Sequence, residues 1–175
     1  MPQLVALSVS IAVLGALATF AFLHLGLPIW AAFLAWACFF HSGGNAEAFK
    51  STVVCNLFGA VAAWVAAVVL LSVPLAGVLT LPGWAALVVG LTVLAVCLAA
   101  HIKPLSNIPA SFYGYAGTAA FFLQTKDALA LPALTSATLS NALVAVGVSM
   151  VIGAALGFAS AKLGAALTAP VPAAA

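Results

Sequence analysis

The side chains best suited to polar chemistry in this chain are two amides, Asn56 and Asn141, that lie inside long apolar stretches. An amide offers N–H donors and a carbonyl acceptor, so it can bind a neutral polar molecule without carrying a charge. An amide inside a membrane can also simply hydrogen-bond between packed helices. The sequence leaves both interpretations open: contacts between helices, or a pair of amides that line a path for a solute.

A second group of polar side chains lies in residues 109–118 (PASFYGYAGT), which contain Tyr113, Tyr115 and Thr118. The two glycines in this segment allow helices to approach closely. They also permit a broken helix with free carbonyls, the kind of site that transporters use. Alternatively, the tyrosines belong to the aromatic belt of a membrane interface. Together with the two amides, these three residues are the candidates for a solute path.

The remaining reactive side chains form no recognisable catalytic or metal-binding pattern. The histidines and cysteines are spread along the chain at positions 24, 41, 101 and 38, 55, 97. A metal site needs several converging ligands, and a hydrolase needs a nucleophile, a base and an acid. We therefore expect no enzyme activity, no catalytic residue, no metal and no cofactor. The odd number of cysteines, each within an apolar run, favours small buried side chains rather than disulfides.

The composition requires a lipid environment around these residues. Of 175 residues, 67% are hydrophobic and 3% are charged, whereas a soluble domain has about 25% charged residues. A surface that faces water cannot be built from so few charges. The net charge of +2, without a basic patch, excludes a nucleic-acid partner. The sequence predicts an all-α polytopic membrane protein in contact with the lipid bilayer.

Apolar runs divide the chain into six segments. The expected spans cover about 4–25, 28–41, 49–73, 83–101, 108–124 and 134–160. The four long segments can cross about 30 Å of hydrocarbon at about 1.5 Å per residue. The two short ones, 28–40 and 108–123, are compatible with full spans or with re-entrant segments.

The lysines favour six complete spans. With six crossings, Lys50, Lys103 and Lys162 lie on the same side of the membrane as the N-terminus. Only Lys126 lies on the opposite side. Positively charged residues concentrate on the cytoplasmic side. We therefore expect six transmembrane helices with both termini cytoplasmic.

The order long, short, long occurs twice and predicts an internal repeat. Residues 51–60 (STVVCNLFGA) and 136–145 (SATLSNALVA) share Ser, Asn and Ala at the same spacing. We expect one three-helix repeat in 1–80, a second in 81–165 and a flexible tail in 166–175. Repeats with three spans each have opposite orientations. This inverted arrangement places Asn56 and Asn141 at similar depths from opposite faces.

The last apolar segment contains a ladder of small residues, Gly153, Gly157 and Ala161. Small residues at this spacing let two helices pack backbone to backbone in a membrane. The ladder is compatible with packing inside one subunit or with a homo-oligomer interface.

Three stretches carry a resemblance to a known family: residues 108–122 (IPASFYGYAGTAAFF), 29–34 (IWAAFL) and 56–59 (NLFG). With them the chain resembles the YcdZ-type family of small bacterial inner-membrane proteins. That family is functionally uncharacterised. The resemblance implies a location in the bacterial inner membrane and supplies no catalytic or binding residue.

The polar residues favour a channel or facilitator for a small neutral or weakly polar solute, such as a urea-like, amide-like or ammonia-like molecule. Proton coupling usually needs an ionisable residue within a span, and the two acids, Glu47 and Asp127, fall in expected loops. Two alternatives remain open. One is a secondary transporter or uniporter with a broken-helix site near Tyr113–Thr118. The other is a non-transporting membrane scaffold or assembly protein.

Overall fold

The computed structural model describes residues 1–168, and in this range the chain forms helices and no strands. The main helices are α1 (Gln3–Leu25), α2 (Ile29–His41), α3 (Ala46–Ser72), α5 (Leu81–Leu98), α6 (Ile108–Gln124) and α8 (Ala142–Leu167). Short turns of helix connect them: α4 (Ala76–Leu79), η1 (Ala99–His101), η2 (Lys103–Leu105) and α7 (Leu131–Leu134). The all-helical prediction is confirmed, and each of the six apolar segments contains one main helix.

Four helical stretches are long and apolar enough to cross a membrane: Gln3–Leu25, Ala46–Ser72, Ala76–His101 and Ala142–Leu167. Ile29–His41 is a shorter apolar helix. Large apolar side chains on α1 point away from the protein, with Leu17, Phe20 and Leu23 exposed by 61%, 71% and 70%. Side chains of this kind are stable at such exposure in contact with lipid, which supports the membrane assignment.

Asparagine side chains define where three of the helices begin. Asn45, Asn107 and Asn141 precede α3, α6 and α8, and each side-chain oxygen accepts a hydrogen bond from a backbone N–H of the first turn. Such caps satisfy donors that the start of a helix leaves free. At the other end, Gly26 stops α1 in the left-handed region, with φ of 68°, where glycine has no steric penalty.

The start of the last helix differs from the prediction. The expected span was 134–160, but α8 begins at Ala142 and continues to Leu167. Asn141 has an extended backbone and caps α8, whereas Asn56 lies in the interior of α3. The expectation that the two amides hold matching positions in their helices is therefore wrong, because the sequence match pairs a helical segment with a non-helical one. The predicted tail overlaps the end of α8, and from residue 169 it lies outside the described residues.

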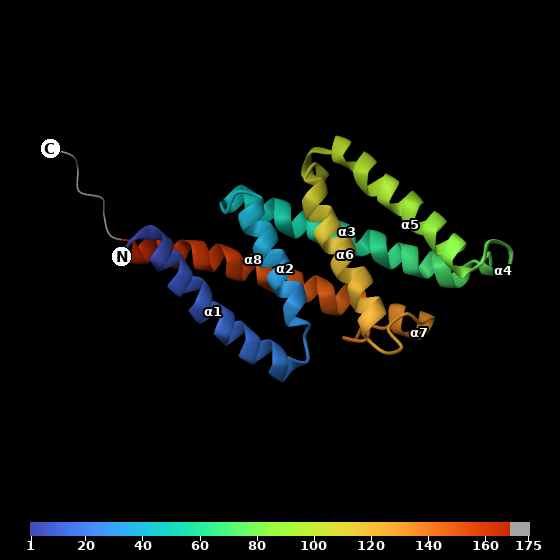
Figure 1. The fold of residues 1–175 in the computed structure, drawn as a ribbon, viewed down its shortest axis with the longest axis horizontal. Coiled ribbons are helices and arrows are strands. Elements are labelled where there is room, and N and C mark those ends of the chain that lie inside the picture. The colour runs from blue at the N-terminus through green and yellow to red at the C-terminus, as the bar shows by residue number, and fades with distance from the viewer. Residues whose placement is uncertain (169–175) are drawn as a thin grey trace.

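The six main helices run in alternating directions (Figure 1). The amino terminus lies at the end of α8, where the Met1 amine donates a hydrogen bond to the Leu167 carbonyl at 3.1 Å.

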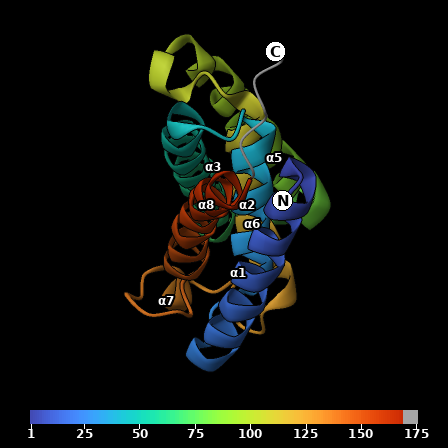
Figure 2. The same ribbon diagram turned by 90° about the vertical axis from the view of Figure 1, so that its left-hand side faces the viewer.

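The two longest helices, α3 and α8, lie against each other, and each is covered by helices of the opposite half of the chain. α8 packs on α1 and α2, and α3 packs on α5 and α6. Figure 1 shows α2 and α6 crossing α8 and α3, while Figure 2 views α8 nearly along its axis with α1 and α2 at its side. The halves 1–80 and 81–165 are thus interleaved rather than separate.

Glycines bring the crossing helices into backbone contact. A Cβ atom added to Gly59 of α3 would lie 1.8 Å from the Ser111 carbonyl oxygen of α6. A Cβ atom added to Gly114 of α6 would lie 1.8 Å from the Asn56 carbonyl oxygen. These distances are far below any van der Waals contact, so only glycine permits this approach. In a membrane, such close packing replaces the hydrophobic driving force that operates in water.

The small-residue ladder of α8 is used within the chain. A Cβ atom on Gly153 would lie 2.0 Å from the Ala32 oxygen of α2, and one on Gly157 would lie 2.8 Å from the Phe39 ring. Both glycines therefore contact α2 of the same chain, and they are not available for the homo-oligomer interface that the sequence also allowed. Ala161, at the end of the ladder, is half-buried.

The contact between α3 and α6 predicts a clear difference between two glycines. Gly114→Ala forces the helices apart and should lower the free energy of unfolding by about 1–3 kcal/mol. The control is Gly90→Ala on α5, where a Cβ meets nothing within 4 Å and the better helix propensity should stabilise by about 0.5–1 kcal/mol. Thermal unfolding in detergent, followed by tryptophan fluorescence, measures both; equal behaviour of the two variants would contradict the contact.

Candidate functional site

The centre of the candidate site is the Asn56 amide in the interior of α3. Its side chain is 1% exposed, and neither Oδ1 nor Nδ2 has a hydrogen-bond partner among residues 1–168. The large majority of buried side-chain polar atoms in proteins are hydrogen-bonded. An unpaired one costs about 1–3 kcal/mol, so this amide requires an explanation.

Thr52 extends the unpaired polar surface along α3. It lies one helical turn before Asn56, which places the two side chains on the same face. Thr52 is fully buried, and within the described chain its hydroxyl has no hydrogen bond of good geometry, although it lies beside the Cys38 thiol of α2. Sequence analysis did not select Thr52, although its spacing of four residues from Asn56 is the signal that could have identified it.

The segment Tyr113–Thr118 of α6 packs against Asn56. Contact occurs at Gly114, which lies directly on the Asn56 backbone. Thr118, one turn further along α6, is fully buried and has an unpaired hydroxyl among residues 1–168. The structure therefore brings Asn56 to the predicted α6 segment, and three unpaired polar side chains belong to this pair of helices.

The broken-helix prediction for this segment is wrong. α6 is a continuous helix from Ile108 to Gln124, so it has no free carbonyls in its middle. The glycines serve close packing instead: Gly114 contacts α3, and a Cβ on Gly117 would lie 2.7 Å from the Met150 methyl group of α8.

The two tyrosines point to different neighbours and do not form one site. Tyr113 packs edge-on against the His41 ring of α2, with centroids 6.2 Å apart. The Tyr115 hydroxyl shares a hydrogen bond of 2.9 Å with the Thr92 hydroxyl of α5. Tyr115 is thereby satisfied within the protein, while Tyr113 lies on the side of α6 that faces α2.

Asn141 has a structural role that differs from that of Asn56. Its Nδ2 donates to the carbonyls of Leu134 and Ser136, both at 2.8 Å, and its Oδ1 accepts from the Leu143 N–H at 3.0 Å. The Trp64 indole of α3 also donates to the Leu134 carbonyl, at 2.9 Å. Every polar atom of the Asn141 amide is thus used to hold the loop before α8 in place.

A polar junction of Ser42, Ser51 and Asn107 lies where α2 ends and where α3 and α6 begin. Asn107 Nδ2 donates to both serine hydroxyls, at 3.0 Å and 3.1 Å. Ser51 precedes Thr52 in α3 but points to a different side of the helix, because adjacent helical residues do not share a face. Asn107 precedes an Ile-Pro pair, a typical helix start that sequence analysis did not use.

Charged side chains are confined to the helix ends and loops. Glu47 lies exposed in the first turn of α3 rather than in a loop, where a negative charge is favoured by the helix dipole. Asp127 is exposed in the turn after α6. Across residues 1–168, no group of three or more His, Cys, Asp or Glu side chains could hold a metal ion. The site around Asn56 therefore consists of an amide and hydroxyls.

Comparison with known proteins assigns the chain to a family. A family model described as "Protein of unknown function (DUF1097)" matches residues 8–165, and the chain belongs to this family. The expectation of an uncharacterised family is thereby confirmed. No curated protein and no solved structure matches the chain.

The contrast between the two amides predicts opposite effects of the same substitution. Asn56→Leu removes an unpaired buried amide of similar size and should raise the free energy of unfolding by about 1–3 kcal/mol. Asn141→Leu removes a helix cap and leaves the Leu134 and Ser136 carbonyls with fewer partners. This substitution should therefore lower the free energy of unfolding by about 1–3 kcal/mol. Thermal unfolding in detergent shows whether each substitution raises or lowers the stability. A loss of stability in Asn56→Leu would show that Asn56 is a contact between helices.

Proposed function

We propose that this member of a family of unknown function conducts a small neutral polar solute across a membrane, with Asn56 as the central polar group of the path. The observation that carries the proposal is the buried Asn56 amide, whose donor and acceptor atoms both lack a partner among residues 1–168. A path for a solute gives these atoms a partner while the solute passes. The sequence alone does not select between this role and a static one.

The chemistry of the site supports a neutral solute. An amide pairs with molecules that offer both donors and acceptors, which include urea-like, amide-like and ammonia-like compounds. Hydroxyls of Thr52 and Thr118 add further donors and acceptors on α3 and α6. Movement of ions or protons within a span usually involves an ionisable residue. On α3 the charged side chains are Glu47 and Lys50, both near its start.

We further infer that all six main helices cross the membrane as two inverted halves, with both termini on the cytoplasmic side of a bacterial inner membrane. Support comes from the alternating helix directions (Figure 1). It also comes from the packing of α3 on α5 and α6 and of α8 on α1 and α2, so that each long helix packs on the opposite half of the chain. Cysteines placed at Lys103 and Lys126 test it, because a membrane-impermeant maleimide should then label the two positions from opposite sides of the membrane.

The polar junction of Ser42, Ser51 and Asn107 supports a direction of access. It lies at the end of the bundle where α3 begins, on the side that this topology makes cytoplasmic. From that end of α3, Thr52 and then Asn56 lie on one face of the helix, one turn apart. A solute from the cytoplasm would meet the hydroxyls first and the amide next.

Permeability of liposomes that contain the purified protein tests the proposal. Stopped-flow light scattering should show faster entry of urea or acetamide than in protein-free liposomes. Asn56→Leu should reduce the protein-dependent rate by about tenfold, since losing about 1.4 kcal/mol of amide interaction corresponds to that factor. Gln124→Leu is the matched control, because Gln124 is an exposed amide at the end of α6, and it should keep the full rate.

The outcomes separate the candidate functions. Saturable uptake with counterflow would indicate a uniporter rather than a channel. No gain in permeability for any solute of the panel, with protein that is folded by circular dichroism, would refute transport. That result would favour a membrane scaffold, which is the function that the fully bonded Asn141 and the glycine contacts between helices support.

A further inference from the structure

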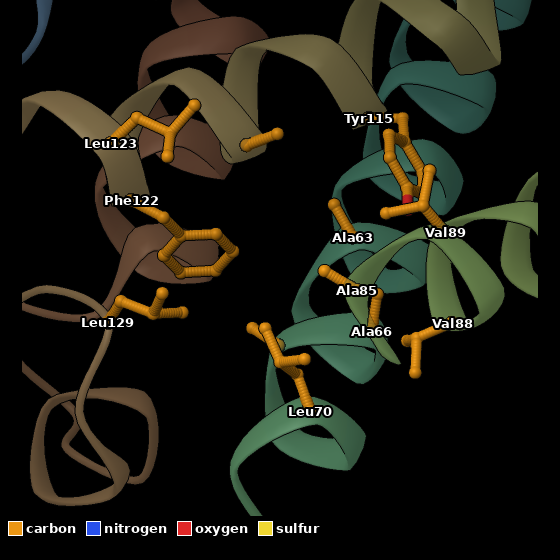
Figure 3. A pocket seen from close by; sticks show the side chains of 12 residues that line it. Ala63, Ala66, Leu70, Ala85, Val88, Val89, Tyr115, Phe122, Leu123 and Leu129 are labelled. Carbon is orange, nitrogen blue, oxygen red and sulfur yellow. The ribbon is translucent and has the colours of Figure 1, made fainter. Parts of the chain in front are cut away.

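A pocket of about 190 Å³ lies between α3, α5, α6 and the segment that follows α6. Figure 3 shows Phe122, Leu123 and Leu129 on one side and Leu70, Ala85 and Val88 on the other. Apart from Tyr115, the lining consists of alanine, valine, leucine and phenylalanine side chains. The pocket is separate from the site at Asn56, since α6 turns a different face to it.

The lining selects an apolar occupant. Tyr115 is its one residue with a polar side-chain atom, and that hydroxyl is already bonded to Thr92 at 2.9 Å. A polar ligand would have to give up hydrogen bonds with water and would find no replacement here, which is costly. An apolar chain loses nothing by entering and gains contacts with the surrounding side chains.

The pocket opens toward the lipid. Leu123 and Val89 at its rim are exposed by 84% and 45%, and both belong to helices with apolar outer surfaces. Its walls come from the second half of α3, the first part of α5 and the second half of α6. These parts lie at the end of the bundle where α6 ends and α8 begins (Figure 1). The acyl chains of that leaflet are therefore next to the opening.

We propose that this pocket binds one acyl chain of a phospholipid, with the phosphate of the same lipid near Lys126. Lys126 is exposed and lies in the chain between Leu123 and Leu129, two residues that line the pocket; Lys126 itself lines the neighbouring depression, together with Asp127. A lysine at the membrane surface attracts the negative charge of a phosphate. The charge of Lys126 and the apolar pocket thus match the two parts of an anionic phospholipid.

The bound chain fills the space between α5 and the α3–α6 pair. It contacts Tyr115 and Ala119 on the face of α6 opposite to Gly117, and Ala63 and Ala66 on α3. A lipid at this position therefore supports the same α6 helix that packs on Asn56, from the outside of the bundle. This lipid would stay bound to the protein, unlike the lipids that exchange freely around it.

Photolabelling tests the lipid site directly. The protein is reconstituted with phosphatidylglycerol that carries a diazirine in its acyl chain, irradiated, digested and analysed by mass spectrometry. Labelling at residues 85–89 and 119–129 should exceed that at the exposed α1 positions Leu17, Phe20 and Leu23 by severalfold. Labelling that simply follows exposure to lipid, with α1 equal to the pocket, would overturn the proposal.

Variants that fill the pocket provide the control. Ala85→Phe and Ala119→Phe place a ring in the pocket from two different helices and should each abolish the excess labelling. Ala12→Phe fills the surface groove between α1 and α2 and should leave it unchanged. If the pocket variants keep the excess labelling while they remain folded, the chain does not bind in this pocket.

A separate measurement tests whether Lys126 binds the lipid phosphate. In competition with phosphatidylcholine, the wild-type protein should prefer phosphatidylglycerol at the labelled residues, and Lys126→Gln should remove the preference. Asp127→Asn, next to it, should keep or strengthen the preference, because it removes a negative charge. A preference that is unchanged in Lys126→Gln would refute the assignment of the phosphate to Lys126.

Discussion

Backbone contact between crossing helices is the constraint on which the rest of this structure depends. In lipid, apolar side chains gain little by leaving their surroundings, so helices associate through close packing and polar contacts. Gly59 and Gly114 bring α3 and α6 together at the distance of touching backbones, and Gly153 does the same for α8 against α2. Because α3 and α8 also contact each other, these crossings join the two halves of the chain into one bundle.

The same contact defines the candidate site. Gly114 lies on the backbone of Asn56, so the amide is enclosed at the point where two helices are closest, and neither of its polar atoms finds a partner among residues 1–168. A buried amide with a purely structural role would be expected to be hydrogen-bonded, as Asn141 is to the Leu134 and Ser136 carbonyls of the loop before α8. The difference between these two amides is the physical basis of the proposed solute path.

The sequence predicts well what depends on local composition and poorly what depends on partners. Six apolar segments locate the six main helices because apolar length is a local property. Asn56 is identified because any amide in an apolar run is unusual. In contrast, the local match of residues 136–141 to 51–56 does not indicate that Asn141 caps a helix. The positions of the glycines in the sequence do not indicate which helix each glycine contacts. Gly153 and Gly157 pack on α2, which only the three-dimensional arrangement reveals.

Access of small polar molecules to position 56 is the most direct test of the central claim. In a background with Cys38, Cys55 and Cys97 changed to alanine, Asn56→Cys places one thiol at the site. A small neutral methanethiosulfonate should modify this thiol from the aqueous phase, and urea should slow the reaction. Ser51→Cys at the polar junction should be modified rapidly. Rapid modification at position 51 with none at position 56 would contradict the account, because it would show that the amide lies in a dry contact between helices.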